Sequence, residues 1–136
     1  MRDHLFALLI NNHPETFASL KQALRQLSVQ TYSVETCKEA EDLIPQCKPH
    51  LIFADLSLWD GSWAYILNLA EQADVPLNVI VVGMIPESHV YVSAMERGAF
   101  DFVAPPFELT LLDFVVRAAA SDARNRREAT ARMAVA

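Results

Sequence analysis

The feature that most constrains the fold of this chain is a short apolar run that ends directly at a carboxylate. Leu51–Ala54 are all apolar, and they are followed by Asp55 and by a polar loop with a turn signal at Asp60–Gly61. An apolar run of this length between turn signals is typical of a strand buried on both faces of a parallel sheet. Ligands of open α/β sheets bind beyond the carboxyl ends of the strands. The pattern therefore predicts that Asp55 lies at the functional edge of such a sheet.

Segments with strand character alternate with segments of helical spacing along the whole chain. The predicted strands are Leu5–Ile10, Thr31–Thr36, Leu51–Ala54, Val79–Val82 and Phe100–Ala104. Strict alternation with short loops implies right-handed crossovers and a parallel sheet that is covered by helices on both faces. We therefore expect an α/β fold, a single doubly wound (βα)5 domain with a central five-stranded parallel sheet.

The helices between these strands are predicted from apolar spacing and from helix-start signals. Pro14 suits the first turn of a helix whose apolar face includes Phe17 and Leu20. A second helix contains Pro45, which is expected to shorten or kink it. A third is expected to bury Tyr65 and Ile66 on one side. The helices after the first are predicted at 38–47, 62–72, 87–97 and 109–120.

Size and charge limit the classes of function. The chain has 136 residues, and we expect one domain at 1–120 followed by an Ala/Arg-rich tail or helix extension at 121–136. The net charge of -6 argues against direct binding to nucleic acid, which requires a basic surface. Leu5–Ile10 is too short for a signal-peptide core or a membrane span, so we expect a cytoplasmic protein without membrane attachment. The two cysteines lack C-x-x-C spacing and are expected to be reduced.

Motifs of common catalytic and nucleotide-binding sites are absent from the sequence. It contains no nucleophile elbow, P-loop or G-x-G-x-x-G string. The four histidines, His4, His13, His50 and His89, do not share the spacing of metal ligands. A lone loop histidine is usually solvated, and we expect this of His13, which follows Asn12.

Several local strings, taken in order, resemble the receiver domain of bacterial response regulators. Asp55–Gly61 looks like the phosphoacceptor strand and loop of that family, Glu96–Phe102 like its fourth-helix exit and fifth strand, and Pro106–Leu112 like the start of its last helix. The resemblance covers residues 5 to about 120. It implies a CheY-like domain with the flavodoxin-like form of the (βα)5 fold.

The resemblance implies five functional positions, of which this chain keeps one. In such receivers two acidic residues after the first strand hold Mg²⁺, an aspartate accepts the phosphoryl group, and a Thr or Ser and a Lys contact that group. Asp55 matches the phosphoacceptor. Asn11 and Asn12 stand at the acidic pair, Gly83 at the hydroxyl and Pro105 at the lysine. The phosphorylation site is therefore degenerate.

These replacements change the expected chemistry. Mg²⁺ is a hard cation that binds through carboxylates, water and phosphate, and Asn11 and Asn12 carry no charge. We therefore expect no metal ion and no other cofactor. The side-chain amides of Asn11 and Asn12 are expected to donate hydrogen bonds to Asp55 instead. The resemblance also predicts a cis peptide bond between Pro105 and Pro106.

Other residues near the predicted site have more than one interpretation. Trp59, Trp63 and Met84 either close the pocket, form an apolar contact surface or simply pack against loops. Phe102 matches the position of a switch aromatic in receivers and is expected to be fixed, because Gly83 offers no hydroxyl to which it could respond. The resemblance places a partner-binding surface on the fourth helix, fifth strand and fifth helix. Its predicted contacts are Arg97, Asp101 and Arg117.

The sequence as a whole predicts a signalling module. The leading interpretation is an atypical receiver, or pseudo-receiver, that acts in a two-component system or phosphorelay by protein–protein interaction. Its expected partner is a sensor histidine kinase or another signalling protein, and a homodimer is a further option. One alternative is a working receiver phosphorylated at Asp55, and another is a module that binds a small ligand in the modified pocket. No independent enzyme activity is expected, because no base is paired with the one reactive carboxylate.

Overall fold

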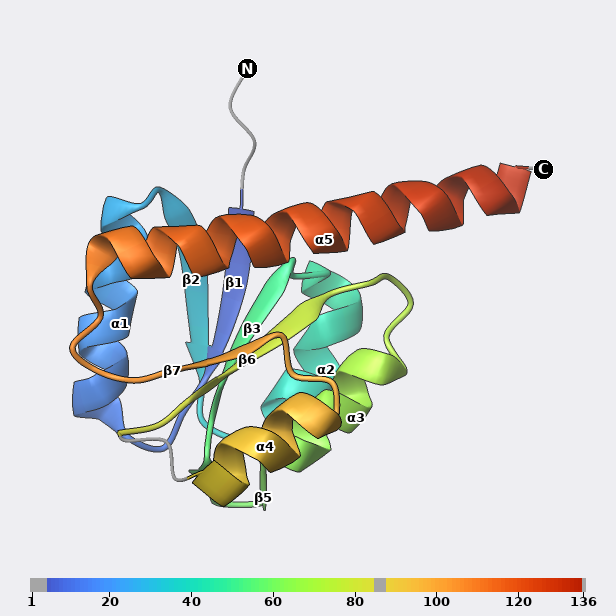
Figure 1. The fold of residues 1–136 in the computed structure, drawn as a ribbon. Helices are drawn as coiled ribbons and strands as arrows, with labels where there is room; N and C mark the ends of the chain where they lie inside the picture. Colours follow the sequence, from blue (N-terminus) through green and yellow to red (C-terminus); the bar gives the residue numbers. More distant parts are fainter. Residues whose placement is uncertain (1–4, 85–87, 136) are drawn as a thin grey trace.

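The computed structural model describes residues 5–84 and 88–135, and it has the predicted α/β architecture. A five-stranded parallel sheet has the strand order β2-β1-β3-β6-β7, which is the doubly wound arrangement (Figure 1). The predicted start of the fourth helix at Glu87 lies outside the described residues. The strands of this sheet are β1 (Leu5–Ile10), β2 (Val29–Val34), β3 (Leu51–Asp55), β6 (Asn78–Val82) and β7 (Asp101–Val103).

Helices cover both faces of the sheet. Helices α1 and α5 pack on one face, and α2, α3 and α4 pack on the other (Figure 1). Their bounds are α1 (Pro14–Gln26), α2 (Cys37–Cys47), α3 (Trp63–Glu71), α4 (Ser88–Glu96) and α5 (Leu109–Val135). Across residues 5–84 and 88–135, none of the helices has both the length and the apolar character needed to cross a membrane.

The central strand β3 shows why an uninterrupted apolar run is required. Ile52 and Ala54 belong to the core beneath α2 and α3, while Leu51 and Phe53 belong to the core beneath α1 and α5. All four side chains are fully buried. Because successive side chains of a strand point to opposite faces, a strand between two helical layers needs apolar residues at every position. The run ends at Asp55, which is paired with Val82 of β6 in the sheet register.

The bounds of one predicted strand and the burial of one predicted core residue differ from the structure. The second strand lies at Val29–Val34 instead of Thr31–Thr36, because Thr36 is the N-cap of α2 and accepts a hydrogen bond from Glu39 N at 3.1 Å. Tyr65 was expected to be buried with Ile66, but it is 41% exposed and its hydroxyl donates to Glu41. Pro45 lies within α2, which is 11 residues long.

A short hairpin that the sequence pattern did not predict follows Asp55. Strands β4 (Ser57–Leu58) and β5 (Gly61–Ser62) pair antiparallel. Between them, the carboxylate of Asp60 accepts hydrogen bonds from Cys37 N (2.7 Å) and Lys38 N (3.1 Å) at the start of α2. These two hydrogen bonds join the hairpin to the start of α2. Burial and the Asp60 carboxylate raise the pKa of the Cys37 thiol to about 11.

Candidate functional site

Asp55 lies at the carboxyl end of β3, beside the loop that follows β1. Its side chain is almost fully buried. The oxygen Oδ1 accepts a hydrogen bond from Leu56 N at 2.9 Å, and Oδ2 accepts one from Asn12 N at 2.8 Å. The Nδ1 atom of His13 lies 2.7 Å from the same Oδ2. The carboxylate is therefore held by two backbone N–H groups and one imidazole.

The loop after β1 donates a hydrogen bond to Asp55 from its backbone, and not from the asparagine side chains as expected. The side-chain amides of Asn11 and Asn12 were expected to donate to Asp55, but the donor is the backbone N–H of Asn12. Asn11 is buried, and its backbone N–H donates to Val34 O at 3.0 Å, which extends the pairing of β1 with β2. The Asn12 side chain is exposed. Of the two asparagines, the backbone N–H of Asn12 contacts the carboxylate, and neither side-chain amide does so within the described part of the chain.

His13 is the site residue that sequence reasoning missed. It was expected to be solvated, and its side chain is indeed 59% exposed, yet Nδ1 contacts the buried carboxylate of Asp55. A carboxylate can only accept hydrogen bonds, so Nδ1 is the donating nitrogen. The signal in the sequence was its place directly after Asn12 at the end of the first strand. That place puts it at the same sheet edge as Asp55.

Gly83, at the end of β6, lies beneath two apolar side chains. Its N–H donates to Val103 O at 3.1 Å. A Cβ atom at this position would lie 2.8 Å from Phe102 Cζ and 2.9 Å from Leu56 Cδ1. Phe102 is buried, and its ring centroid is 6.4 Å from that of Tyr91. The volume that a Thr or Ser side chain would occupy is therefore filled by Phe102 and Leu56.

The comparison with known families identifies this arrangement. A family model for the response regulator receiver domain matches residues 7–117. The chain belongs to this family. The aspartate at the end of β3, the glycine at the end of β6 and the aromatic on β7 are thus placed in a receiver fold.

Two relatives from Pseudomonas aeruginosa illustrate the extent of the similarity. The chain is 26% identical over 113 residues to "Response regulator protein PilR", and 34% identical over 116 residues to "C4-dicarboxylate transport transcriptional regulatory protein DctD". The alignments cover 83% and 82% of this receiver but only 25% and 24% of the relatives. The chain therefore spans about a quarter of the length of these relatives.

Solved structures agree with the receiver fold. The signal receiver domain of a protein described as a LuxO repressor from Vibrio parahaemolyticus gives a TM-score of 0.77 at 29% identity, over 89% of this chain and 93% of that chain. NtrX from Brucella abortus gives a TM-score of 0.80 at 22% identity, over 94% of this chain and 29% of that chain. The second similarity concerns the fold alone.

The remaining positions of the receiver site carry few polar groups. The peptide bond between Pro105 and Pro106 is cis, as predicted. Among the described residues, His13 is the one side chain able to carry a positive charge that contacts Asp55. Within the same part of the chain, no group of three or more His, Cys, Asp or Glu side chains is placed to hold a metal ion.

The aromatic and Met residues near the site are unequally packed. Trp59, at the tip of the β4–β5 hairpin, is 84% exposed, so it neither packs against loops nor closes a pocket. Met84 is also exposed, and its Sδ atom accepts a long contact of 3.6 Å from Thr16 Oγ1. Trp63 is half-buried, and the guanidinium of Arg97 lies 6.0 Å from its ring centroid.

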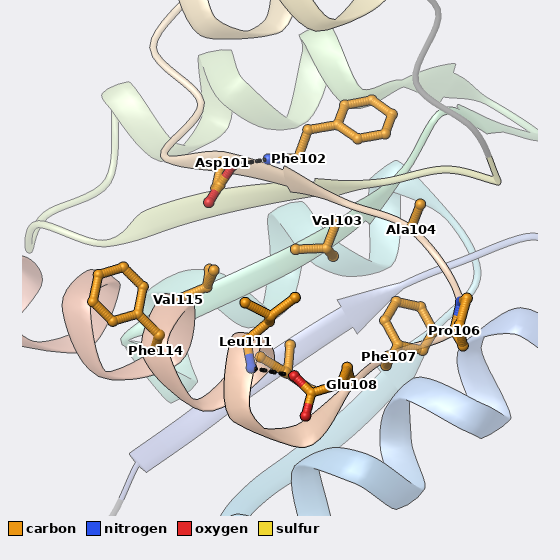
Figure 2. Close-up of a pocket in the computed structure, with 11 residues that line it drawn as sticks. Asp101, Phe102, Val103, Ala104, Pro106, Phe107, Glu108, Leu111, Phe114 and Val115 are labelled. Carbon is orange, nitrogen blue, oxygen red and sulfur yellow. Dashed lines mark hydrogen bonds between the residues drawn. The ribbon is translucent and has the colours of Figure 1, made fainter.

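The three charged residues predicted to contact a partner are each engaged within the receiver. Asp101 accepts a hydrogen bond from Phe102 N, Arg117 pairs with Asp113, and Arg97 lies over Trp63. Their neighbourhood also contains exposed apolar side chains that the sequence reasoning did not name. Leu111 and Phe114 line a pocket of about 310 Å³ between α5 and β7. Figure 2 shows both side chains on α5. Leu111 is 68% exposed and Phe114 is 74% exposed.

Proposed function

We propose that this receiver is a pseudo-receiver, which works in a two-component system or phosphorelay by protein–protein contact and without ordinary Mg²⁺-dependent phosphorylation of Asp55. The single observation that carries the proposal is the contact of His13 Nδ1 with Asp55 Oδ2 at 2.7 Å. Together with Asn12 N and Leu56 N, this contact engages both oxygens of a carboxylate that is only 4% exposed. A phosphoryl donor would have to displace these groups.

The donor set around Asp55 does not fit Mg²⁺. This ion requires hard oxygen ligands in a near-octahedral arrangement and is usually bound through one or two carboxylates. Among the described residues Asp55 is the one carboxylate placed here, an imidazole contacts its Oδ2, and the neighbouring loop offers the uncharged side chains of Asn11 and Asn12. Phosphoryl transfer depends on charge stabilisation by metal ions and cationic groups, which Gly83 and Pro105 do not supply. No cofactor is therefore part of the proposed function.

The proposed interaction surface lies on α4, β7 and α5. Exposed apolar side chains of this size on one face, Leu111 and Phe114 here, are typical of contact sites between proteins. Asp101 lines the same pocket as Leu111 and Phe114, and Arg117 lines a second one with Phe114, so these two would form a charged rim. Arg97, which lies over Trp63, is a further proposed contact. The partner is a sensor histidine kinase, another signalling protein or a second copy of the chain, in the cytoplasm. Neither nucleic-acid binding, membrane attachment nor catalytic turnover belongs to the proposal.

Intact mass measurement after treatment with acetyl phosphate and Mg²⁺ tests the loss of aspartyl phosphorylation. The wild-type chain should gain no phosphoryl group at Asp55, and Asp55→Asn is the matched control. A mass gain that alkali removes and that Asp55→Asn abolishes would show a working phosphoacceptor and contradict the proposal. The same samples in sedimentation experiments report whether the treatment changes the association state.

A further inference from the structure

The imidazole of His13 has one nitrogen fixed by Asp55 and one nitrogen that has no hydrogen-bond partner among the described residues. Nδ1 donates to Asp55 Oδ2 at 2.7 Å, and this is the one hydrogen bond of the ring within residues 5–84 and 88–135. The side chain is 59% exposed, whereas that of Asp55 is 5% exposed. Because Nδ1 carries the ring proton, the lone pair of the neutral ring is on Nε2.

A buried carboxylate that accepts from one imidazole nitrogen makes the other nitrogen a better nucleophile or ligand. The carboxylate fixes the tautomer and the ring orientation, and it thus leaves the lone pair on the second nitrogen. The same contact stabilises the positive charge that forms when that nitrogen makes a bond. Asp55 is suited to this role because Asn12 N and Leu56 N hold it in place.

We propose that His13 Nε2 is a phosphoryl acceptor, so that the covalent mark of this chain is a phosphohistidine oriented by Asp55. This modification site goes beyond the proposed function, which concerns the loss of aspartyl phosphorylation and the interaction surface. The donor belongs to the class of phosphoramidates, in which the phosphorus is bonded to nitrogen. A protein phosphohistidine and a small phosphoramidate share this chemistry.

The proposed step balances without a metal ion or an added base. The lone pair of Nε2 attacks phosphorus, an N–P bond forms, and the bond between phosphorus and the donor nitrogen breaks, with its electron pair leaving on that nitrogen. The leaving nitrogen takes a proton from water. The ring becomes a phosphoimidazolium whose Nδ1–H stays bonded to Asp55, so no proton leaves the ring. One N–P bond replaces another.

The start of α1 supports the charge of the product. His13 is the N-cap of this helix, and Pro14 occupies its first turn. The backbone N–H groups of a first turn have no intrahelical acceptor, and the helix dipole favours negative charge there. Glu15 is the one acidic residue of that turn. Glu15→Gln should therefore increase the rate of labelling.

The test uses the full chain, phosphoramidate as the only donor, and EDTA to remove divalent ions. Intact mass should show the addition of one phosphoryl group, and peptide mapping should place it on His13. A phosphohistidine is labile in acid and stable in alkali, whereas an aspartyl phosphate is hydrolysed in alkali. His13→Gln should abolish the label, and Asp55→Asn should slow labelling about 10-fold, the lower end of the effect of removing the carboxylate behind a metal-binding histidine.

His89→Gln is the matched control, because His89 is an exposed histidine on α4. It should label like the wild type. A label that persists in His13→Gln, that disappears in His89→Gln or that alkali removes would overturn the proposal, and so would the absence of any label. Failure with phosphoramidate leaves the proposed function intact, since that function fails only when acetyl phosphate and Mg²⁺ label Asp55. A partner's phosphohistidine offered in place of phosphoramidate then distinguishes a protein donor from a small one.

Discussion

The two edges of the sheet differ in how their polar groups are used. At the carboxyl edge, Asp55 has three contacts, from His13 Nδ1, Asn12 N and Leu56 N. At the amino edge, a cluster of four polar side chains joins β6, two loops and the second half of α5. We call it the Asn78 cluster, and its members are Asn78, Asp122, Arg126 and Arg127.

The Asn78 cluster is the more extensively bonded of the two. Asn78 Nδ2 donates to Ala119 O at 2.8 Å and to Asp122 Oδ2 at 3.0 Å, and its Oδ1 accepts from Arg126 at 2.8 Å. Arg127 donates to Pro76 O and Pro49 O, both at 2.7 Å. The larger of the two hydrogen-bond networks thus lies at the amino edge, away from Asp55, where it holds α5 against the start of β6 and the neighbouring loops. More of the polar side chains compared therefore stabilise the packing of α5 than contribute to the site around Asp55.

Breaking the Asn78 cluster should have the largest effect. Asn78→Ala should lower the free energy of unfolding by about 2–3 kcal/mol, because buried partners left without hydrogen bonds each cost about 1–3 kcal/mol. Asp55→Asn should lower the free energy of unfolding by less. The control is Asn125→Ala, at an exposed position of α5, which should change stability by less than about 0.5 kcal/mol. Urea denaturation measures all three. An equal or larger loss in Asp55→Asn would reverse the comparison.

The second prediction restores a hydroxyl at the carboxyl edge. Gly83→Thr should destabilise the chain by about 1–3 kcal/mol, because its side chain would overlap Phe102 and Leu56. Phe102→Ala in the same chain should remove much of that penalty, so a double-mutant cycle should give a clear coupling energy. Additive losses would mean that Phe102 does not fill the hydroxyl position.

The third prediction concerns the proposed interaction surface. Phe114→Asp should weaken self-association or partner binding by about 10-fold or more, since exposed aromatic side chains dominate such interfaces. Charge reversal at Asp101 or Arg117 should have a smaller effect, because both residues are rim positions engaged with their own chain. Asp55→Ala should leave association nearly unchanged. Sedimentation at several concentrations gives the ranking, and a dominant effect of Asp55→Ala would show that the carboxyl edge controls the surface.

A smaller effect is expected from the acid titration of the Asn78 cluster. The hydrogen bond from Asn78, with a further contribution from Arg126, lowers the pKa of Asp122. A lowered pKa in the folded state means that the stabilisation is present above the unfolded pKa of about 3.9 and is lost as the pH falls through the folded value. Asp122→Asn should therefore flatten the decline of stability below about pH 4. Thermal unfolding from neutral to acid pH measures it, and an unchanged acid profile would exclude Asp122 as a contributor.

The smallest expected effect is the response to Mg²⁺. A titration followed by the fluorescence of Trp59 and Trp63 should be flat at millimolar concentration. Asn11→Asp and Asn12→Asp together with His13→Ala should restore saturable binding, because they supply carboxylates and free Asp55 Oδ2. Saturable binding by the wild type that disappears in Asp55→Asn would show that the carboxyl edge keeps its metal chemistry.

The sequence predicted the elements of the fold better than its polar contacts. The apolar run Leu51–Ala54 is a local signal, because a strand that is buried between two helical layers requires apolar residues at every position. The contact of His13 with Asp55 joins residues 42 positions apart, and that of Arg127 with Pro49 joins residues 78 apart. Such pairs depend on where the folded chain brings loops together, and no periodicity encodes them. The position of Phe102 followed from resemblance, but the direction of its ring depends on the volume left by Gly83.

The length of α5 has a mechanical consequence. The helix has 27 residues, and at 1.5 Å per residue it is roughly 40 Å long. Phe114 lies near its start, the Asn78 cluster holds its middle, and its last turns extend past the sheet (Figure 1). Among the described residues, the buried side chains of this helix end at Ala123, so its last turns project from the domain as an arm. Because the helix runs from the carboxyl edge of the sheet to the amino edge, a protein bound to this arm would be held on the opposite side of the domain from Asp55.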